Sequence, residues 1–287
     1  MKTRRHILIL GGTAESRELV ERLADFPELQ VEISLAGRTK TSRALEPSKS
    51  SNIAASCKAD KTTANNTAAK VPASASIRTG GFGGVEGLAR YLTIQKIDAL
   101  VVATHPFAAQ IARNAFEAAK EVGIPALRVE RSAWSPQKGD HWISARDMEE
   151  AAHLLGAGPS NIFLTIGRQQ LEPFEQLDRQ LCSQYGKSQH HYVVRSIEPI
   201  TPPPALTHVT WVQARGPFSK AEEIALMKHH DIDTLVTKNS GSPQVYAKLE
   251  AARALGVKVI MVERPELPDF ECTESVEEAV RWVMRRF

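Results

Sequence analysis

Short apolar runs alternate with helical patterns along this chain, and the alternation occurs twice at a nearly constant offset. The apolar runs at residues 97–101 and 232–236 lie 135 residues apart, and each precedes a polar loop and an alanine-rich stretch. Strands that alternate with helices form a parallel sheet with helices on both faces. The sequence therefore predicts an α/β fold of two Rossmann-like parallel-sheet lobes, with a ligand cleft between them. Chance similarity between unrelated strand–helix units is the alternative.

The first half of the chain contains additional residues of unusual composition. The run at residues 7–12 and its counterpart at 162–167 are 155 residues apart, so the offset changes upstream of residue 80. Within residues 47–76, 24 of the 30 residues are Ala, Ser, Thr, Asn or Lys, which cannot bury enough apolar surface to offset their ordering entropy. We predict a flexible insertion at about residues 42–76, an N-terminal lobe over 1–135 and a C-terminal lobe over 136–287. The last helix, at residues 276–287, could pack on either lobe.

Composition excludes several classes of protein. The net charge of +3 is too small to indicate a nucleic-acid partner. The three cysteines Cys57, Cys182 and Cys272 lie far apart, so neither a disulfide framework nor a cysteine zinc site is expected. The N-terminal apolar run stops after four residues, too short for a secretory signal, and no run approaches the length of a membrane span. We therefore expect a soluble cytoplasmic protein that binds neither membranes nor nucleic acid.

The turn at residues 11–16 follows the first predicted strand and opens a helix. Its glycines would let a diphosphate approach the backbone, and the helix N-terminus supplies N–H groups and a positive dipole end. The pattern departs from G-x-G-x-x-G, because Thr13 and Ser16 stand at positions that the pattern gives to glycine or alanine. A plain strand-to-helix turn capped by Thr13 remains the alternative.

A second turn, at residues 37–40, follows the second predicted strand. NAD-binding sites usually place an acid there to bond the ribose hydroxyls, whereas arginine accommodates a 2′-phosphate. Here Arg38 and Lys40 flank Thr39 and no acid is present. The turn therefore favours NADP over NAD, unless it is only a solvated basic turn.

Two further loops follow the strands at 97–102 and 232–236. His105 lies in the first, next to a proline that could begin the following helix, and is a candidate proton donor or a local cap. The second loop contains Lys238 within five consecutive polar or glycine residues, a composition typical of an anion-binding loop or of a structural turn. With Arg168 and Arg215, Lys238 places three cations on strand-end loops of the second half, which indicates a ligand with several carboxylates or phosphates.

Other candidate sites are weaker. The adjacent pairs at residues 190–191 and 229–230 are histidines without a third ligand at suitable spacing, so we predict no metal site. Neither a G-x-S-x-G elbow nor a G-x-x-x-x-G-K-[ST] loop is present. We interpret Arg281, Arg285 and Arg286 as a solvated helix face that also suits the negative end of the helix dipole.

Seven motifs of this chain, in order along nearly its whole length, resemble those of the precorrin-6A reductase family. They are Ile-Leu-Gly-Gly-Thr-Ala-Glu-Ser (9–16), Leu-Ala-Gly-Arg-Thr (35–39), Gly-Gly-Phe-Gly-Gly (80–84), Ala-Thr-His-Pro-Phe-Ala (103–108), Ala-Arg-Gly-Pro-Phe (214–218), Thr-Lys-Asn-Ser-Gly (237–241) and Tyr-Ala-Lys-Leu (246–249). The stretch at about 42–76 departs from the family, whose members usually have a much shorter link there.

The resemblance implies reduction of one double bond of the precorrin-6A macrocycle, or of its cobalt-bearing form, by hydride transfer from NADPH, with a proton added at the neighbouring carbon. It implies a tetrapyrrole substrate and transient contact with neighbouring enzymes of cobalamin biosynthesis. The cofactor-binding residues that we predict are Gly11, Gly12, Thr13, Ala14, Glu15, Ser16, Arg38, Thr39, Gly81, Phe82 and Gly83. The substrate-binding residues that we predict are Thr104, His105, Arg168, Gln169, Arg215, Gly216, Thr237, Lys238, Asn239, Ser240 and Gly241. His105, Lys238 and solvent are the candidate proton donors.

Two rival functions fit parts of the same pattern. One is an NADP-dependent reductase or epimerase acting on another small anion. The other is a two-lobed protein that binds a ligand without chemistry, which would have no need of a 2′-phosphate pocket beside Arg38.

Overall fold

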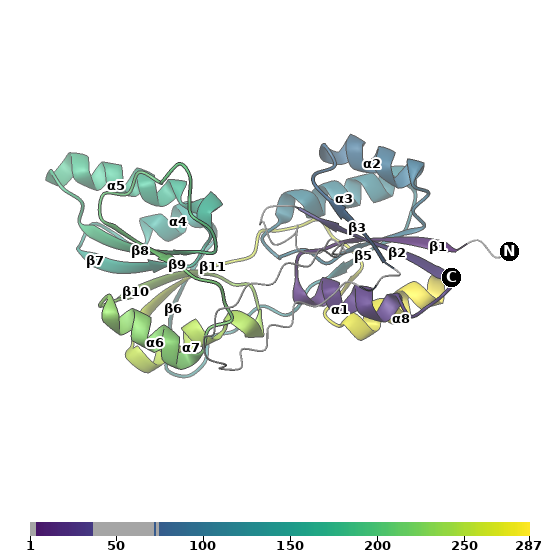
Figure 1. The fold of residues 1–287 in the computed structure, drawn as a ribbon. Coiled ribbons are helices and arrows are strands. Elements are labelled where there is room, and N and C mark those ends of the chain that lie inside the picture. Colours follow the sequence, from purple (N-terminus) through teal and green to yellow (C-terminus); the bar gives the residue numbers. More distant parts are fainter. Residues whose placement is uncertain (1–3, 37–71, 73–74) are drawn as a thin grey trace, which may run out of the picture. The chain divides into compact units, whose positions relative to one another are not determined.

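The chain forms two compact α/β units, shown in Figure 1. The computed structural model describes residues 4–36, 72 and 75–287. Unit 1 consists of residues 1–130 and 268–287, and unit 2 consists of residues 131–267. Each unit contains one six-stranded sheet whose neighbouring strands all pair in parallel. The predicted fold class is therefore confirmed.

Unit 1 has strand order β12-β5-β4-β1-β2-β3. Its strands are β1 (Arg5–Leu10), β2 (Leu29–Leu35), β3 (Ala75–Thr79), β4 (Ala99–Val102), β5 (Ala126–Val129) and β12 (Cys272–Thr273). Its helices are α1 (Ala14–Leu23), α2 (Gly84–Ile94), α3 (Ala109–Val122) and α8 (Val276–Arg286). Helices α2 and α3 cover one face of the sheet, and α1 and α8 cover the other (Figure 1). The apolar run of β1 is central and buried, and with α1, β2 and α8 it forms the core on that second face.

Unit 2 repeats this plan with strand order β6-β11-β10-β7-β8-β9. Its strands are β6 (His141–Ala145), β7 (Ser160–Leu164), β8 (His190–Ser196), β9 (Val209–Gln213), β10 (Thr234–Lys238) and β11 (Lys258–Val262). Its helices are α4 (Met148–His153), η2 (Arg168–Gln170), α5 (Glu172–Tyr185), α6 (Lys220–His229), η3 (Pro243–Val245) and α7 (Ala247–Leu255). Helices α4 and α5 lie on one face of the sheet, and α6 and α7 lie on the other (Figure 1). The equivalent strand positions of β1 and β7, and of β4 and β10, confirm the predicted repeat.

The two halves of the chain exchange their last strand and helix. After β5 the chain enters unit 2, where β6 pairs with β11. After β11 it returns to unit 1, where β12 pairs with β5. The edge strands β6 and β12 therefore each follow, in sequence, a strand of the other unit, β5 and β11 respectively. The predicted boundary at 135/136 differs from this arrangement, because residues 268–287 belong to unit 1 and α8 packs against α1.

The additional residues of the first half lie between β2 and β3. Residues 36–74 make this connection, whereas residues 197–208 make the equivalent connection between β8 and β9. Most of the predicted insertion, together with Arg38 and Thr39, lies outside the described residues. Its predicted end needs correction, because Ala75 and Ser76 belong to β3, where they pair with Val31 and Glu32.

Candidate functional site

The turn after β1 presents an open backbone surface at Gly12. Gly12 has φ +134°, which disfavours any residue with a Cβ, and a Cβ at this position would meet nothing within 4 Å. Gly11 is required for packing instead, because its Cβ would lie 2.7 Å from Ile33 Cδ1. A ligand can therefore approach the backbone at Gly12, while Gly11 holds the turn against β2.

The buried side chains of Thr13 and Ser16 hold this turn by hydrogen bonds. The Thr13 hydroxyl caps α1 by accepting from the Ser16 N–H, and it donates to the Ala103 carbonyl at 2.9 Å. Ser16 Oγ accepts from the N–H groups of Gly12 and Thr13 at 3.1 and 3.2 Å. Both side chains are buried, so the capping role that the sequence left open for Thr13 is present. These two residues shape the turn rather than line its open side.

Ala14 and Glu15 form the first turn of α1 beside Gly12 and are partly exposed. The Glu15 carboxylate is favourable at the positive end of the helix. It would repel a diphosphate at the same place, so it suits a neutral hydroxyl group of a ligand better.

The strand order brings three turns of unit 1 to one edge of the sheet. The loops after β4, β1 and β3 all leave the carboxyl ends of parallel strands, and the Thr13–Ala103 hydrogen bond joins the first two. After β3, glycines at 80, 83 and 84 have positive φ, and the side chain of Phe82 packs on Tyr91 with ring centroids 5.2 Å apart. Gly81 and Gly83 are exposed. The predicted cofactor-binding turns after β1 and β3 therefore lie at the same edge of the sheet, with β2 between their strands.

His105 is exposed on the loop after β4, next to the partly exposed Thr104. Its Nδ1 accepts from the Phe107 N–H at 3.2 Å, so the neutral ring carries its proton on Nε2. This contact is the local hydrogen bond that the sequence offered as one role of His105, and the role of proton donor stays a prediction. The expectation that Pro106 begins the next helix is wrong, because α3 begins at Ala109.

Unit 2 brings Lys238 to the end of β7. The strands β10 and β7 are neighbours, and Lys238 Nζ donates to Gln170 Oε1 at 2.8 Å. Burial lowers the pKa of the Lys238 ammonium to about 8. A buried ammonium bonded to a neutral amide gains stability when a carboxylate approaches it.

Lys248, on α7, is a second lysine at this place and is buried, and the sequence reasoning did not identify it as a site residue. Its Nζ donates to Thr165 Oγ1 at 3.2 Å, just after β7, and its side chain is 5% exposed. Burial lowers the pKa of Lys248 to about 7, with further contributions from Arg195 and Lys238. The sequence signal that could have identified Lys248 is its position beside Leu249, on the apolar face of a short helix.

The remaining residues of the loop after β10 are occupied by contacts within unit 2. The Asn239 amide accepts from the Trp134 N–H at 2.7 Å and donates to the Trp134 carbonyl at 3.1 Å. Arg131 donates to the Ser240 carbonyl, and Thr237 is fully buried. A Cβ at Gly241 would lie 2.1 Å from the Ser132 carbonyl oxygen. Thr237 and Lys238 themselves end β10, and these contacts fix the loop that follows Lys238.

The two predicted arginines of unit 2 lie apart. Arg168 follows β7 and approaches Glu198 at 3.8 Å, with a side chain 43% exposed. Gln169 beside it is exposed. Arg215 and Gly216 are exposed on the loop after β9, which is separated from β7 by β8. Arg168 and Lys238 therefore occupy neighbouring strand ends, and Arg215 lies further along the same edge.

The described residues contain no group of three His, Cys, Asp or Glu side chains able to hold a metal ion. His191 and His230 do come close, with ring centroids 6.5 Å apart. A cavity of about 310 Å³ lies at the amino ends of β7 and β8, lined in part by His190, His191 and Asp233.

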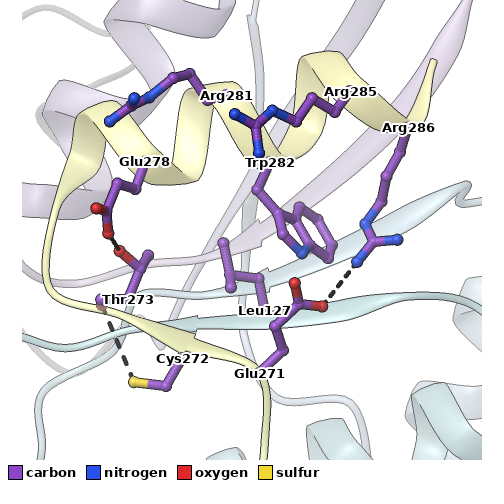
Figure 2. A pocket seen from close by; sticks show the side chains of 9 residues that line it. All are labelled: Leu127, Glu271, Cys272, Thr273, Glu278, Arg281, Trp282, Arg285 and Arg286. Atoms are coloured by element: carbon purple, nitrogen blue, oxygen red, sulfur yellow. Dashed lines mark hydrogen bonds and ion pairs between the residues drawn. The ribbon is translucent and has the colours of Figure 1, made fainter.

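A larger cavity of about 480 Å³ lies between α8 and β12 and contains none of the predicted site residues (Figure 2). Arg281 and Arg285 are exposed, as expected for a solvated helix face. Arg286 instead donates to Glu271 at 2.7 Å and stacks 4.3 Å from the Trp282 ring centroid.

Among the residues described, no helix is both long and apolar enough to cross a bilayer.

The pKa shifts of three histidines predict that the stabilities of the two units respond to pH in opposite directions. Burial lowers the pKa of His190 and His230 in unit 2 from 6.5, so they stabilise the fold above that value and less as pH falls. In unit 1, a hydrogen bond to Glu32 raises the pKa of His6, whose contribution is complete below 6.5 and is lost as pH rises. Between about pH 7.5 and about pH 5.5, hydrogen exchange corrected for intrinsic rates should show unit 2 losing protection and unit 1 gaining it.

Variants separate this effect from general acid sensitivity. His190→Gln should flatten the response of unit 2, whereas His153→Gln, at an exposed position of α4, should leave it unchanged. Parallel loss of protection in both units would contradict the prediction.

Comparisons with known proteins agree along nearly the whole chain. The family model described as Precorrin-6x reductase CbiJ/CobK matches residues 53–284. The precorrin-6A reductase of Rhodococcus erythropolis is 43% identical over 280 residues, 96% of this chain and 96% of that protein. That of a Sinorhizobium species is 40% identical over 96% of this chain and 90% of its own length. The solved structure of CobK precorrin-6A reductase superposes with a TM-score of 0.77 at 33% identity, covering 99% of this chain and 97% of that one.

Proposed function

The chain belongs to the precorrin-6x reductase CbiJ/CobK family, and from this premise we propose that unit 1 binds NADPH and unit 2 binds the carboxylates of the macrocycle. The reaction is the reduction of precorrin-6A in cobalamin biosynthesis, performed by an NADPH-dependent oxidoreductase. The contrast between the two sheet edges supports this assignment. Unit 1 offers an open glycine turn, whereas unit 2 offers the half-buried Lys238 and the buried Lys248.

The turns of unit 1 fit a dinucleotide. The open side of Gly12 lets a diphosphate reach the backbone at the N-terminus of α1. Bound there, NADPH supplies a hydride to one carbon of a macrocycle double bond. Thr13 and Ser16 keep the turn in shape, and the exposed turn at residues 81–83 contacts the cofactor from the neighbouring part of the edge.

The cations of unit 2 orient the macrocycle. Lys238 and Lys248 donate to the neutral side chains of Gln170 and Thr165, so a substrate carboxylate that takes the place of either acceptor would form a stronger, charge-assisted hydrogen bond. Arg168 and Arg215 extend the same edge with exposed charges that can bind further carboxylates. Thr237, Asn239, Ser240 and Gly241 then act as the support of Lys238, and Gly216 lets the loop of Arg215 turn.

The neighbouring carbon of the reduced bond must receive a proton. His105 Nε2 and Lys238 Nζ are the protein atoms that we propose for holding it, with solvent as the alternative source. Thr104, beside His105, orients the substrate. Contact with neighbouring enzymes and a cytoplasmic location stay predictions from the sequence.

We further propose that the substrate is metal-free precorrin-6A. Both curated relatives described above have the name precorrin-6A reductase, without cobalt. NADPH oxidation, followed with metal-free and cobalt-loaded substrate in parallel, should give a kcat/KM at least about tenfold higher for the metal-free form, equivalent to ~1.4 kcal/mol of transition-state stabilisation. Equal kcat/KM values would show that the site does not distinguish the two substrates. If neither substrate caused NADPH oxidation, the result would contradict the function as a precorrin-6A reductase.

Cofactor preference tests the sequence-based assignment of Arg38. Arg38→Ala should weaken NADPH binding by about tenfold or more and leave NADH binding nearly unchanged, because only NADPH carries the 2′-phosphate. Fluorescence titration of both nucleotides measures this directly. Arg90→Ala, at an exposed position of α2, is the control and should change neither affinity. Equal affinity of the wild type for both nucleotides would refute the assignment.

A further inference from the structure

In each unit, an arginine from a strand stacks on the phenylalanine of a strand-end turn. Arg78 Cζ lies 3.8 Å from the Phe82 ring centroid, and Arg195 Cζ lies 4.0 Å from the Phe218 ring centroid. Phe82 and Phe218 precede equivalent helices, α2 and α6. The arginines, however, come from β3 and β8, which occupy different positions in their sheets. The repeat of the fold alone therefore does not account for the shared contact.

Arg78 holds the turn after β3 through hydrogen bonds to carbonyl groups of that turn. Its two terminal nitrogens donate to the Gly80 and Gly81 carbonyls, each at 2.7 Å. In a trans peptide unit the C=O and N–H point in opposite directions, so the N–H groups of Gly81 and Phe82 point away from the guanidinium. Arg78 thereby leaves these two donors on the side of the turn opposite to its guanidinium.

A network of Tyr91, Glu32 and His6 holds Arg78 and Phe82 in place. Tyr91 packs on Phe82, and its hydroxyl donates to Glu32, which also pairs with His6 at 3.3 Å. Burial opposes ionisation of Glu32, but hydrogen bonds from His6 and Tyr91 outweigh it and lower its pKa. The Tyr91 hydroxyl stays protonated, because burial and Glu32 raise its pKa to about 12. Charge on Glu32 therefore persists beside Arg78.

Arg195 performs the corresponding task in unit 2 with an ion pair. Its terminal nitrogens donate to the two Glu223 carboxylate oxygens at 3.0 and 2.9 Å. The side chains of Arg195 and Glu223 are 9% and 2% exposed. Because Glu223 lies in the first turn of α6, this pair ties β8 to the helix that follows Phe218. The turn that carries Arg215 is thus held at its end.

We propose that Arg78 and Arg195 are positioning residues, which fix the turn at residues 80–84 toward the dinucleotide and the turn at residues 215–218 toward a macrocycle carboxylate. Neither guanidinium serves as a ligand cation, since the terminal nitrogens of both are bonded within the protein. The proposal rests on the proposed function, which places the two ligands in different units.

Lysine replacement separates positioning from charge. Lysine keeps the charge of Arg78 and Arg195 but loses the planar fork and the stacking surface. Arg78→Lys should raise the KM for NADPH about tenfold and leave the KM for precorrin-6A within about twofold. Arg195→Lys should give the reverse pattern. The controls Arg90→Lys and Arg179→Lys, at exposed helix positions, should change neither constant.

Two further measurements distinguish a loss of positioning from a failure of the variant to fold. NADPH affinity from fluorescence titration reports the Arg78 effect without turnover. Phe218→Leu keeps the Arg195–Glu223 pair and removes only the stacked ring, so it should still raise the KM for precorrin-6A if Arg195→Lys fails to fold. Selective changes in the stated directions support the proposal. Lower thermal stability with both KM values unchanged, or both raised equally, overturns it, and a reversed pattern overturns the ligand assignment of the proposed function.

Discussion

Replacing Lys238 by alanine is expected to raise the dissociation constant for precorrin-6A about 100-fold, equivalent to ~2.7 kcal/mol, while leaving that for NADPH within about twofold. Lys238 is half-buried and donates to a neutral amide, and burial lowers its pKa, so a carboxylate that approaches it meets an ammonium in a poorly solvated place. Alanine removes that partner and leaves the carboxylate desolvated without compensation. Titration of precorrin-6A by absorbance without NADPH measures the effect.

The pH dependence of binding provides a second readout for the same residue. Because burial lowers the pKa of Lys238 to about 8, its ammonium form is lost as pH rises through that value. Macrocycle affinity of the wild type should therefore fall as pH rises through about 7, where Lys248 loses its proton, and further through about 8, and Lys238→Ala should flatten the second part of this profile. Lys228→Ala, an exposed lysine of α6, is the control. Loss of NADPH affinity in Lys238→Ala instead would place the two ligands in the opposite units.

The strands and turns that build the site were predictable because their signals are local. Buried parallel strands appear as continuous apolar runs, as at residues 7–10 and 99–102, and glycine or polar residues mark their ends. The side-by-side arrangement of these ends follows from the topology of a parallel sheet. Sequence alone therefore predicted that the turn of Gly12 and the loop after Lys238 follow the carboxyl ends of parallel strands, where the structure has them.

The exchange of edge strands was not predictable, because its signals are weak. β12 contains only Cys272 and Thr273, and β6 is a short mixed segment. The apolar stripe of α8, formed by Val276, Ala279 and Val283, could cover either sheet. Only the pairing of β12 with β5 determines which unit receives it.

The contacts of Asn239 were not predictable from residue type. An amide after a strand suggests a ligand contact, which stays a prediction, and the structure shows this amide bonded to the backbone of Trp134, 105 positions away in sequence. Lys248 was missed for the converse reason. Its charge lies on a helix, and only packing against Thr165 and the Trp134 ring reveals that it is buried at the strand ends.

Glu223→Ala is expected to lower the free energy of unfolding by about 3–5 kcal/mol, because it leaves the buried Arg195 guanidinium without its carboxylate. Chemical denaturation with intrinsic fluorescence measures the change, and Glu149→Ala, an exposed acid of α4, should stay within about 0.5 kcal/mol of the wild type. The double variant Glu223→Ala, Arg195→Met removes both charges, so it should recover most of the lost stability. It should not recover macrocycle affinity, since methionine cannot tie β8 to α6. Full recovery of both properties would mean that the pair serves only the stability of unit 2, and recovery of neither would mean that packing, rather than the unpaired charge, accounts for the loss.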